Sequence, residues 1–185
     1  GSNMVSNIAC MNKSLIALGH PGLHVVLYDD DRVTEANVAR QLFYESDLGQ
    51  YKAEVLISRI NRAFGTNWVS VCKRYDFKLT YEGDIKNNIT ISCVDTVAAR
   101  MEIAKVLKER KHHYGIYDYN AAYYWMDCGN SNKSGQVFIG TVKKINQPSS
   151  DKYDTVNIIR LPDFYFKNEK DSKADGPSCS LAEGL

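Results

Sequence analysis

Apolar residues recur at the spacing of a helix in three stretches of the chain. The first covers residues 4–18 and is closed by Gly19, the second runs from residue 52 to 64 before Gly65, and the third covers about residues 96–110. The positions expected to face inward are Met4, Ile8, Met11, Leu15 and Leu18 in the first helix, Ala53, Leu56, Ile57, Ile60 and Phe64 in the second, and Val97, Met101, Ala104 and Leu107 in the third.

Short apolar runs alternate with these helices. Residues 24–28, 68–72 and 89–94 are each typical of a strand, and the first is expected to be a buried strand of a parallel sheet. Residues 122–127 and 135–141 predict two strands on either side of a turn. The alternation predicts an α/β fold, a Rossmann-like, mostly parallel sheet with helices on both faces. A mixed or antiparallel extension is expected in the C-terminal third.

Composition narrows the class of protein further. The chain has 185 residues, which favours a single domain over residues 1–185. Its formal net charge of +1 gives no reason to expect nucleic acid or a membrane as partner. The five cysteines are dispersed, with no C-x-x-C pair, so no zinc site is predicted and a reducing, cytoplasmic location is expected.

Acidic residues stand where the first strand should end. Asp29, Asp30 and Asp31 follow the apolar run directly, and the carboxyl ends of parallel strands are where such sheets bind ligands. A carboxylate at that point commonly binds ribose hydroxyls. Arg40 and Lys52 follow, and together these residues suit a ligand with both ribose and phosphates. The alternative is a solvated acidic turn with surface cations.

The same stretch carries a family resemblance. Asp29-x-Asp31-x-Val33-x-x-x-Asn37-x-x-Arg40-Gln41, followed by Asp47-x-Gly49-x-x-Lys52-Ala53, resembles the signature of the ThiF/MoeB/ubiquitin-activating enzyme superfamily. Ala36 and Val38 stand where Ser and Leu are usual. Residues 17–23 and 176–183 resemble the ThiF-like protein of the bacterial PRTRC system in particular. Members of the superfamily that carry zinc use paired cysteines, which this chain lacks.

The resemblance implies a role for each residue of the first site. Asp29 would bind the ribose hydroxyls, while Arg40 and Lys52 neutralise the phosphates of ATP. Asn37 and Gln41 would shape the site, and Asp31 would be a secondary contact or a structural acid.

A second strand, acid and helix follow at residues 89–110. Cys93-Val-Asp-Thr-Val-Ala-Ala-Arg100 resembles the second signature of the superfamily, in which the acid, here Asp95, works with Mg²⁺. The alternative is that Asp95 and Thr96 only cap the helix. Arg100 is expected to pack or pair on the helix rather than to bind ligand.

Relatives have a strand and a glycine-rich phosphate loop that ends in Gly-Ser. Gly1 and Ser2 match that ending, so we expect this chain to begin inside the phosphate loop and to lack the strand before it, and also the C-terminal helix after Leu185. The alternative for Gly1-Ser2 is an expression remnant.

The setting of Cys179, Pro177-Ser-Cys-Ser-Leu181, resembles that of the catalytic cysteine in ubiquitin-activating enzymes. A thiolate there would capture an acyl-adenylate as a thioester. An inert cysteine at the start of a helix is the alternative.

The expected function is ATP-dependent adenylation of the C-terminal carboxylate of a small ubiquitin-like or sulfur-carrier protein, by a homodimer that uses ATP and Mg²⁺. Two alternatives stay open. One is a non-catalytic interaction or dimerisation module with the same fold. The other is a dinucleotide-dependent oxidoreductase, which has less need of paired Arg40 and Lys52.

Overall fold

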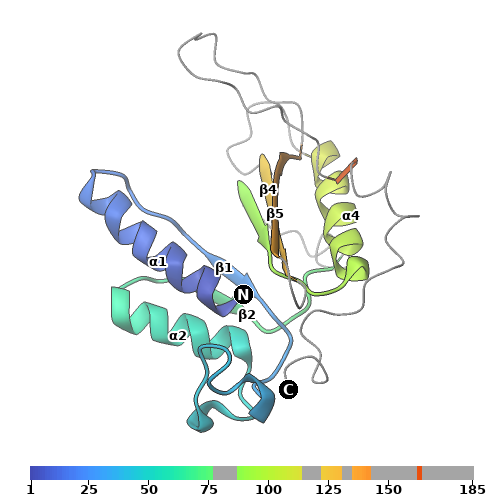
Figure 1. Cartoon of the computed structure of the whole chain (residues 1–185). Coiled ribbons are helices and arrows are strands. Elements are labelled where there is room, and N and C mark those ends of the chain that lie inside the picture. The colour runs from blue at the N-terminus through green and yellow to red at the C-terminus, as the bar shows by residue number, and fades with distance from the viewer. Residues whose placement is uncertain (77–86, 114–121, 131–134, 143–161, 164–185) are drawn as a thin grey trace. The chain divides into compact units, whose positions relative to one another are not determined.

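The computed structural model describes residues 1–76, 87–113, 122–130, 135–142 and 162–163. The chain divides into two compact units, Gly1–Tyr75 and Asp76–Leu185 (Figure 1). No helix among the described residues is long and apolar enough to cross a membrane.

The first unit contains two long helices and a pair of parallel strands. Its elements are α1 (Ser2–Ala17), β1 (Val26–Tyr28), the short 3-10 helices η1 (Glu35–Asn37) and η2 (Glu45–Asp47), α2 (Lys52–Phe64) and β2 (Val69–Val71). β1 pairs with β2 in parallel, with Leu27 opposite Ser70. The predicted helices and strands of this unit are therefore confirmed, with the strands shorter than expected.

β1 is less buried than predicted. Val26 is exposed, and Leu27 and Tyr28 are only partly buried. Among the described residues β1 pairs with β2 alone, so one edge of the strand has no neighbouring strand to cover it. The expectation of a buried strand is therefore met only in part by these three residues.

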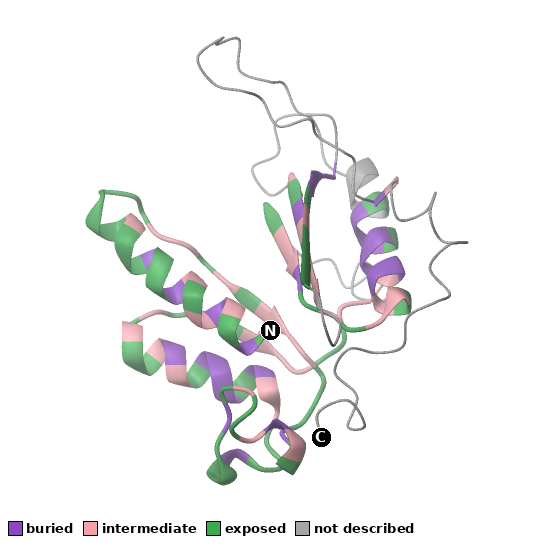
Figure 2. Cartoon of the chain, viewed as in Figure 1, coloured by how far each residue is buried: buried purple, intermediate pink, exposed green. Residues whose placement is uncertain are grey.

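The core of the first unit lies between α1, α2 and the strands, and Figure 2 shows buried residues on both helices. The prediction for α2 is confirmed, since Ala53, Leu56, Ile57 and Ile60 are buried. The helix ends at Gly65, whose φ of 65° lies in the left-handed region that favours glycine.

The inward face of α1 differs from the predicted one. Met11 and Leu18 are 50% and 83% exposed, while Val5, Ala9 and Asn12 are buried. Ala9 permits close packing, and the Oδ1 of Asn12 accepts a hydrogen bond of 2.6 Å from the backbone N–H of Leu23. A buried polar side chain with a partner thus replaces part of the expected apolar stripe.

The second unit contains β3 (Ile89–Ser92), α4 (Val97–His113), β4 (Tyr124–Asn130) and β5 (Gly135–Thr141). β3 pairs with β4 in parallel, and β4 pairs with β5 antiparallel. Met101, Ala104 and Leu107 of α4 are buried, as predicted. The Rossmann-like α/β fold and its mixed extension are confirmed.

Candidate nucleotide site

An acidic turn leaves the sheet at the carboxyl end of β1. The backbone N–H of Asp29 still donates to the carbonyl of Val71 in β2, at 3.2 Å. The Oδ1 of Asp29 then accepts a hydrogen bond of 2.9 Å from the backbone N–H of Asp31. The Asp29 side chain is therefore held at the end of the strand, partly buried, while Asp30 and Asp31 are exposed.

Burial raises the pKa of the Asp29 carboxyl, and the nearby charges of Asp31 and Asp30 raise it further, against the opposing effects of the Asp31 N–H and Lys52. One oxygen from each of the three carboxyls lies within 4.8 Å of the others. Carboxylate oxygens are the ligands that Mg²⁺ prefers, so the donor set suits that ion chemically. Exposed acidic groups of this kind are also common without a metal.

Lys52, the first residue of α2, lies beside this turn. Its Nζ is 2.9 Å from Oδ2 of Asp31, and its backbone N–H donates to the Asp31 carbonyl, also at 2.9 Å. The Lys52 side chain is only 14% exposed. The structure thus brings Asp29, Asp31 and Lys52 together, as the sequence pattern predicts for a strand end followed by a helix start.

The loop between β1 and α2 carries the other predicted residues. Asn37 is buried, and its Oδ1 accepts hydrogen bonds of 3.0 Å from the backbone N–H and the hydroxyl of Thr34, so it stabilises η1. Arg40 is exposed, and its Nε donates to the carbonyl of Ala36 at 3.1 Å. Gln41 is partly buried and lines an open hollow of about 550 Å³.

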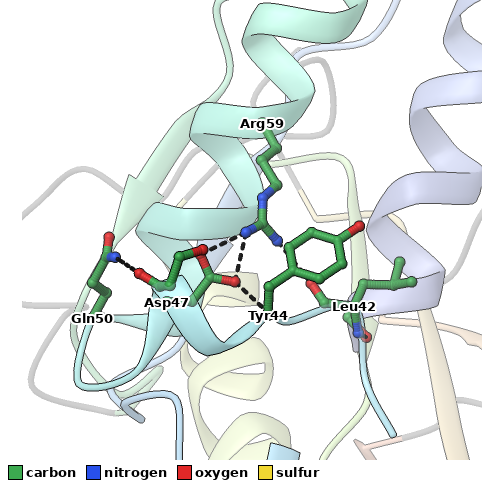
Figure 3. Close-up of polar contacts among 7 residues, drawn as sticks. Leu42, Tyr44, Asp47, Gln50 and Arg59 are labelled. Atoms are coloured by element: carbon green, nitrogen blue, oxygen red, sulfur yellow. Dashed lines mark hydrogen bonds and ion pairs between the residues drawn. The ribbon is translucent and has the colours of Figure 1, made fainter. Parts of the chain in front are cut away.

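An ion pair that the sequence analysis did not predict holds the far end of this loop. Figure 3 shows that Arg59 of α2 donates to both carboxylate oxygens of Asp47, each at 2.5 Å. Asp47 also accepts from the backbone N–H of Tyr44 at 2.7 Å, and the Arg59 guanidinium lies over the Tyr44 ring, 4.5 Å from its centroid. The only signal in the sequence was Asp47 itself, as a motif residue.

Asp47 is therefore a structural residue in this fold. Its burial opposes ionisation, but the Tyr44 N–H and the Arg59 charge outweigh that effect, and the pKa of Asp47 lies below its ordinary value. A third hydrogen bond from Arg59 reaches the Leu42 carbonyl at 3.0 Å. Together these bonds fix the segment that follows Arg40 and Gln41.

The start of α1 meets the same segment. Gly1 precedes the first turn of the helix, and Ser2 is buried. The Ser2 Oγ accepts a hydrogen bond of 3.4 Å from the backbone N–H of Leu42, next to Gln41. The amino end of α1, which carries the positive end of the helix dipole, thus lies next to the loop that holds the predicted phosphate-binding residues.

Two further predicted site residues, Asp95 and Cys179, come later in the chain than the first unit. Asp95 belongs to the second unit, where it follows β3 and is exposed. The adjacent Thr96 accepts a hydrogen bond of 3.2 Å from the backbone N–H of Ala99 and so caps α4. Cys179 lies outside the described residues.

Arg100 was predicted to pack or pair on its own helix, whereas in the structure it pairs with a residue of β4 in a buried network. Its Nε lies 2.8 Å from Oδ2 of Asp127 in β4, and its Nη2 donates to the Val94 carbonyl at 2.7 Å. The hydroxyl of Ser92 donates to the other oxygen of Asp127 and accepts from the Trp125 indole. Asp127 and Trp125 are 0% exposed.

These features define a class of protein: an α/β domain with acids and a lysine at the carboxyl end of a parallel strand, the arrangement of a nucleotide-binding domain. The model of the ThiF family matches residues 9–182, and the chain belongs to that family. No curated protein matches the chain.

Membership supports the coarser part of the predictions. ThiF-family proteins are adenylyltransferases of the type that activates ubiquitin-like or sulfur-carrier proteins, and they use ATP, typically with Mg²⁺. The resemblance to the wider ThiF/MoeB/ubiquitin-activating superfamily is confirmed. The likeness to the PRTRC system stays a prediction.

Proposed function

We propose that this chain catalyses ATP-dependent adenylation of the C-terminal carboxylate of a small ubiquitin-like or sulfur-carrier protein. The observation that carries the proposal is the grouping of Asp29, Asp31 and Lys52 at the end of β1, in a chain that belongs to the ThiF family. A half-buried acid for ribose and an adjacent cation for phosphate are what a nucleoside triphosphate requires.

The reaction joins a carboxylate oxygen to the α-phosphorus of ATP, and the bond to pyrophosphate breaks. The protein contributes mainly position and charge, since negative charge must be neutralised on the phosphates as they separate. Asp29 binds the ribose hydroxyls in this proposal, and Lys52 and Arg40 face the phosphates. The amino end of α1, with Gly1 and Ser2, supplies N–H groups and a favourable dipole.

Lys52 needs no large movement for this role. Asp31 already holds its ammonium group at 2.9 Å, and an ammonium has three donors, of which one is used in that pair. A phosphate oxygen therefore binds a lysine that is already positioned. Asp31 acts through Lys52 and is a positioning residue rather than a ligand of ATP.

The other roles complete the proposal. Asn37 and Gln41 shape the loop around the phosphates, and Asp95 holds Mg²⁺, which neutralises phosphate charge when it is bound. In a thioester step, the Cys179 thiolate attacks the acyl-adenylate, forms the thioester bond and releases AMP. A homodimer, a cytoplasmic location and a single domain over residues 1–185 remain predictions.

A specific observation favours a second candidate, a non-catalytic ThiF-like interaction or dimerisation module. The Arg40 side chain is bonded to its own loop at Ala36, and Lys52 is paired with Asp31. In a protein that binds no ATP, both bonds serve only to order the loop.

Exchange of labelled pyrophosphate into ATP, measured with Mg²⁺ and a panel of small ubiquitin-like and sulfur-carrier proteins, separates the two candidates. Adenylation predicts exchange that depends on one carrier and is abolished by Lys52→Ala or Asp95→Ala. Lys13→Ala is a matched control, because Lys13 is an exposed residue of α1 and should leave exchange intact. Exchange that persists in both site variants contradicts the assignment.

A further inference from the structure

Two cysteines of the second unit lie side by side in the sheet, one directly after β3 and the other within the neighbouring strand β4. β3 and β4 are parallel, with Ser92 opposite Asp127 in the last pair of the ladder. The residue after each of these is a cysteine: Cys93 follows the end of β3, and Cys128 is the next residue within β4. Both are free thiols, Cys93 exposed and Cys128 partly buried.

The environment of the Cys128 thiol is consistent with this register. Burial raises the pKa of the Cys128 thiol, and the neighbouring Cys93, which is also its hydrogen-bond partner, raises it further. Ser92 and Asp127 bond to each other on one face of the sheet. Because successive side chains alternate between faces, Cys93 and Cys128 share the opposite face.

We propose that Cys93 and Cys128 form a redox-active pair that a disulfide oxidant such as oxidised glutathione converts into an intramolecular disulfide. Neighbouring strands lie about 4.8 Å apart, within the ~4.4–6.8 Å range of Cα separations that disulfides span. Cys93 follows the last residue of β3, so its backbone can move toward β4 without breaking the ladder.

The exchange balances without another reactant. The exposed Cys93 loses its proton and attacks one sulfur of oxidised glutathione, which forms a mixed disulfide and releases one glutathione. Cys128 then loses its proton and attacks the Cys93 sulfur, which releases the second glutathione. Two protein thiols are oxidised, one glutathione disulfide is reduced to two thiols, and dithiothreitol reverses the change.

The bridge would join β4 to the turn that begins at Cys93 and reaches Asp95 two residues later. Oxidation would therefore restrain the segment that carries a predicted site residue. The formation of the bridge itself depends on the sheet register and the accessibility of Cys93, and not on whether the protein binds ATP.

The test is incubation of the reduced full-length chain with oxidised glutathione, followed by alkylation of remaining thiols and peptide mapping without reductant. The expected result is a dominant Cys93–Cys128 cross-linked peptide, lost on adding dithiothreitol, while Cys72 stays alkylated. In the Cys128→Ser variant, Cys93 should instead accumulate as the glutathione mixed disulfide, whereas a Cys10→Ser control should form the bridge normally. Wild-type protein that keeps glutathione on Cys93 with Cys128 alkylated, or that forms no Cys93–Cys128 peptide, overturns the proposal.

Discussion

The buried pair of Arg100 and Asp127 is the strongest test of how the second unit is held together. Replacing Asp127 by Asn keeps the shape of the side chain but removes its charge, which leaves the guanidinium of Arg100, 9% exposed, without its ionic partner. The Ser92 hydroxyl, which donates to a carboxylate oxygen of Asp127, would then face the side-chain amide of the new Asn.

Removing one partner of a buried ion pair typically costs about 3–5 kcal/mol. That is a large part of the ~5–15 kcal/mol by which a typical protein is stable. With an m-value of about 2 kcal/mol per molar urea, Asp127→Asn should lower the unfolding midpoint by roughly 1.5–2.5 M.

Urea unfolding followed by tryptophan fluorescence measures this shift, because Trp125 bonds to Ser92 in the same network. The matched control is Glu102→Gln, which breaks an exposed pair with Lys105 on α4 and should cost no more than about 1 kcal/mol. In a double-mutant cycle with Arg100→Met, the double variant should lose less than the sum of the single losses. Equal small losses for Asp127→Asn and Glu102→Gln, or simple additivity in the cycle, would refute the reasoning.

Two further predictions concern the packing and the loop. Gly129→Ala places a Cβ 2.7 Å from Nη2 of Arg100, which the Val94 carbonyl holds in place, so thermal or urea unfolding should show a loss of about 1–3 kcal/mol. Gly135→Ala is the control: a Cβ there would lie 3.8 Å from the Gly129 carbonyl oxygen, an ordinary contact distance, so this variant should unfold nearly as the wild type does. For Asp47, whose pKa is lowered in the fold, the stabilising effect of ionisation should be complete above the ordinary Asp pKa of about 3.9 and should fade as the pH falls below it. Urea unfolding of wild type and Asp47→Asn from pH 7 to pH 2.5 measures this effect. The difference in unfolding free energy between the two proteins should shrink only in that acidic window. A difference that does not depend on pH would contradict the pairing of Asp47 with Arg59.

The local elements were predictable because their signals are local. The helix that begins at Lys52 was predicted to the residue, since its apolar period and Gly65 both act within a few residues. The proximity of Asp29 and Lys52 follows from the same logic, because a strand end and the next helix start lie close together in a parallel α/β unit.

The predictions that were wrong or missing have a common physical cause. Each concerns a residue whose environment is set by a partner distant in the sequence. Hydrophobicity alone placed Met11 and Leu18 inside, whereas the fold buries Asn12 because the Leu23 N–H satisfies it. The partner of Arg100 stands 27 positions later, in another strand, and no spacing rule indicates it. The same holds for Arg59 and Asp47, whose pairing emerges only when α2 packs against the loop.

The central claim is that the end of β1, with Lys52, binds the phosphates of ATP. Calorimetric titration of ATP with Mg²⁺ into the wild type, Lys52→Ala and the Lys13→Ala control tests it most directly. The claim predicts that wild type and Lys13→Ala bind alike, and that Lys52→Ala binds at least about tenfold more weakly, since a lost charge-assisted bond costs about 1.5–3 kcal/mol. Equal binding by wild type and Lys52→Ala, or no binding by the wild type, would contradict it.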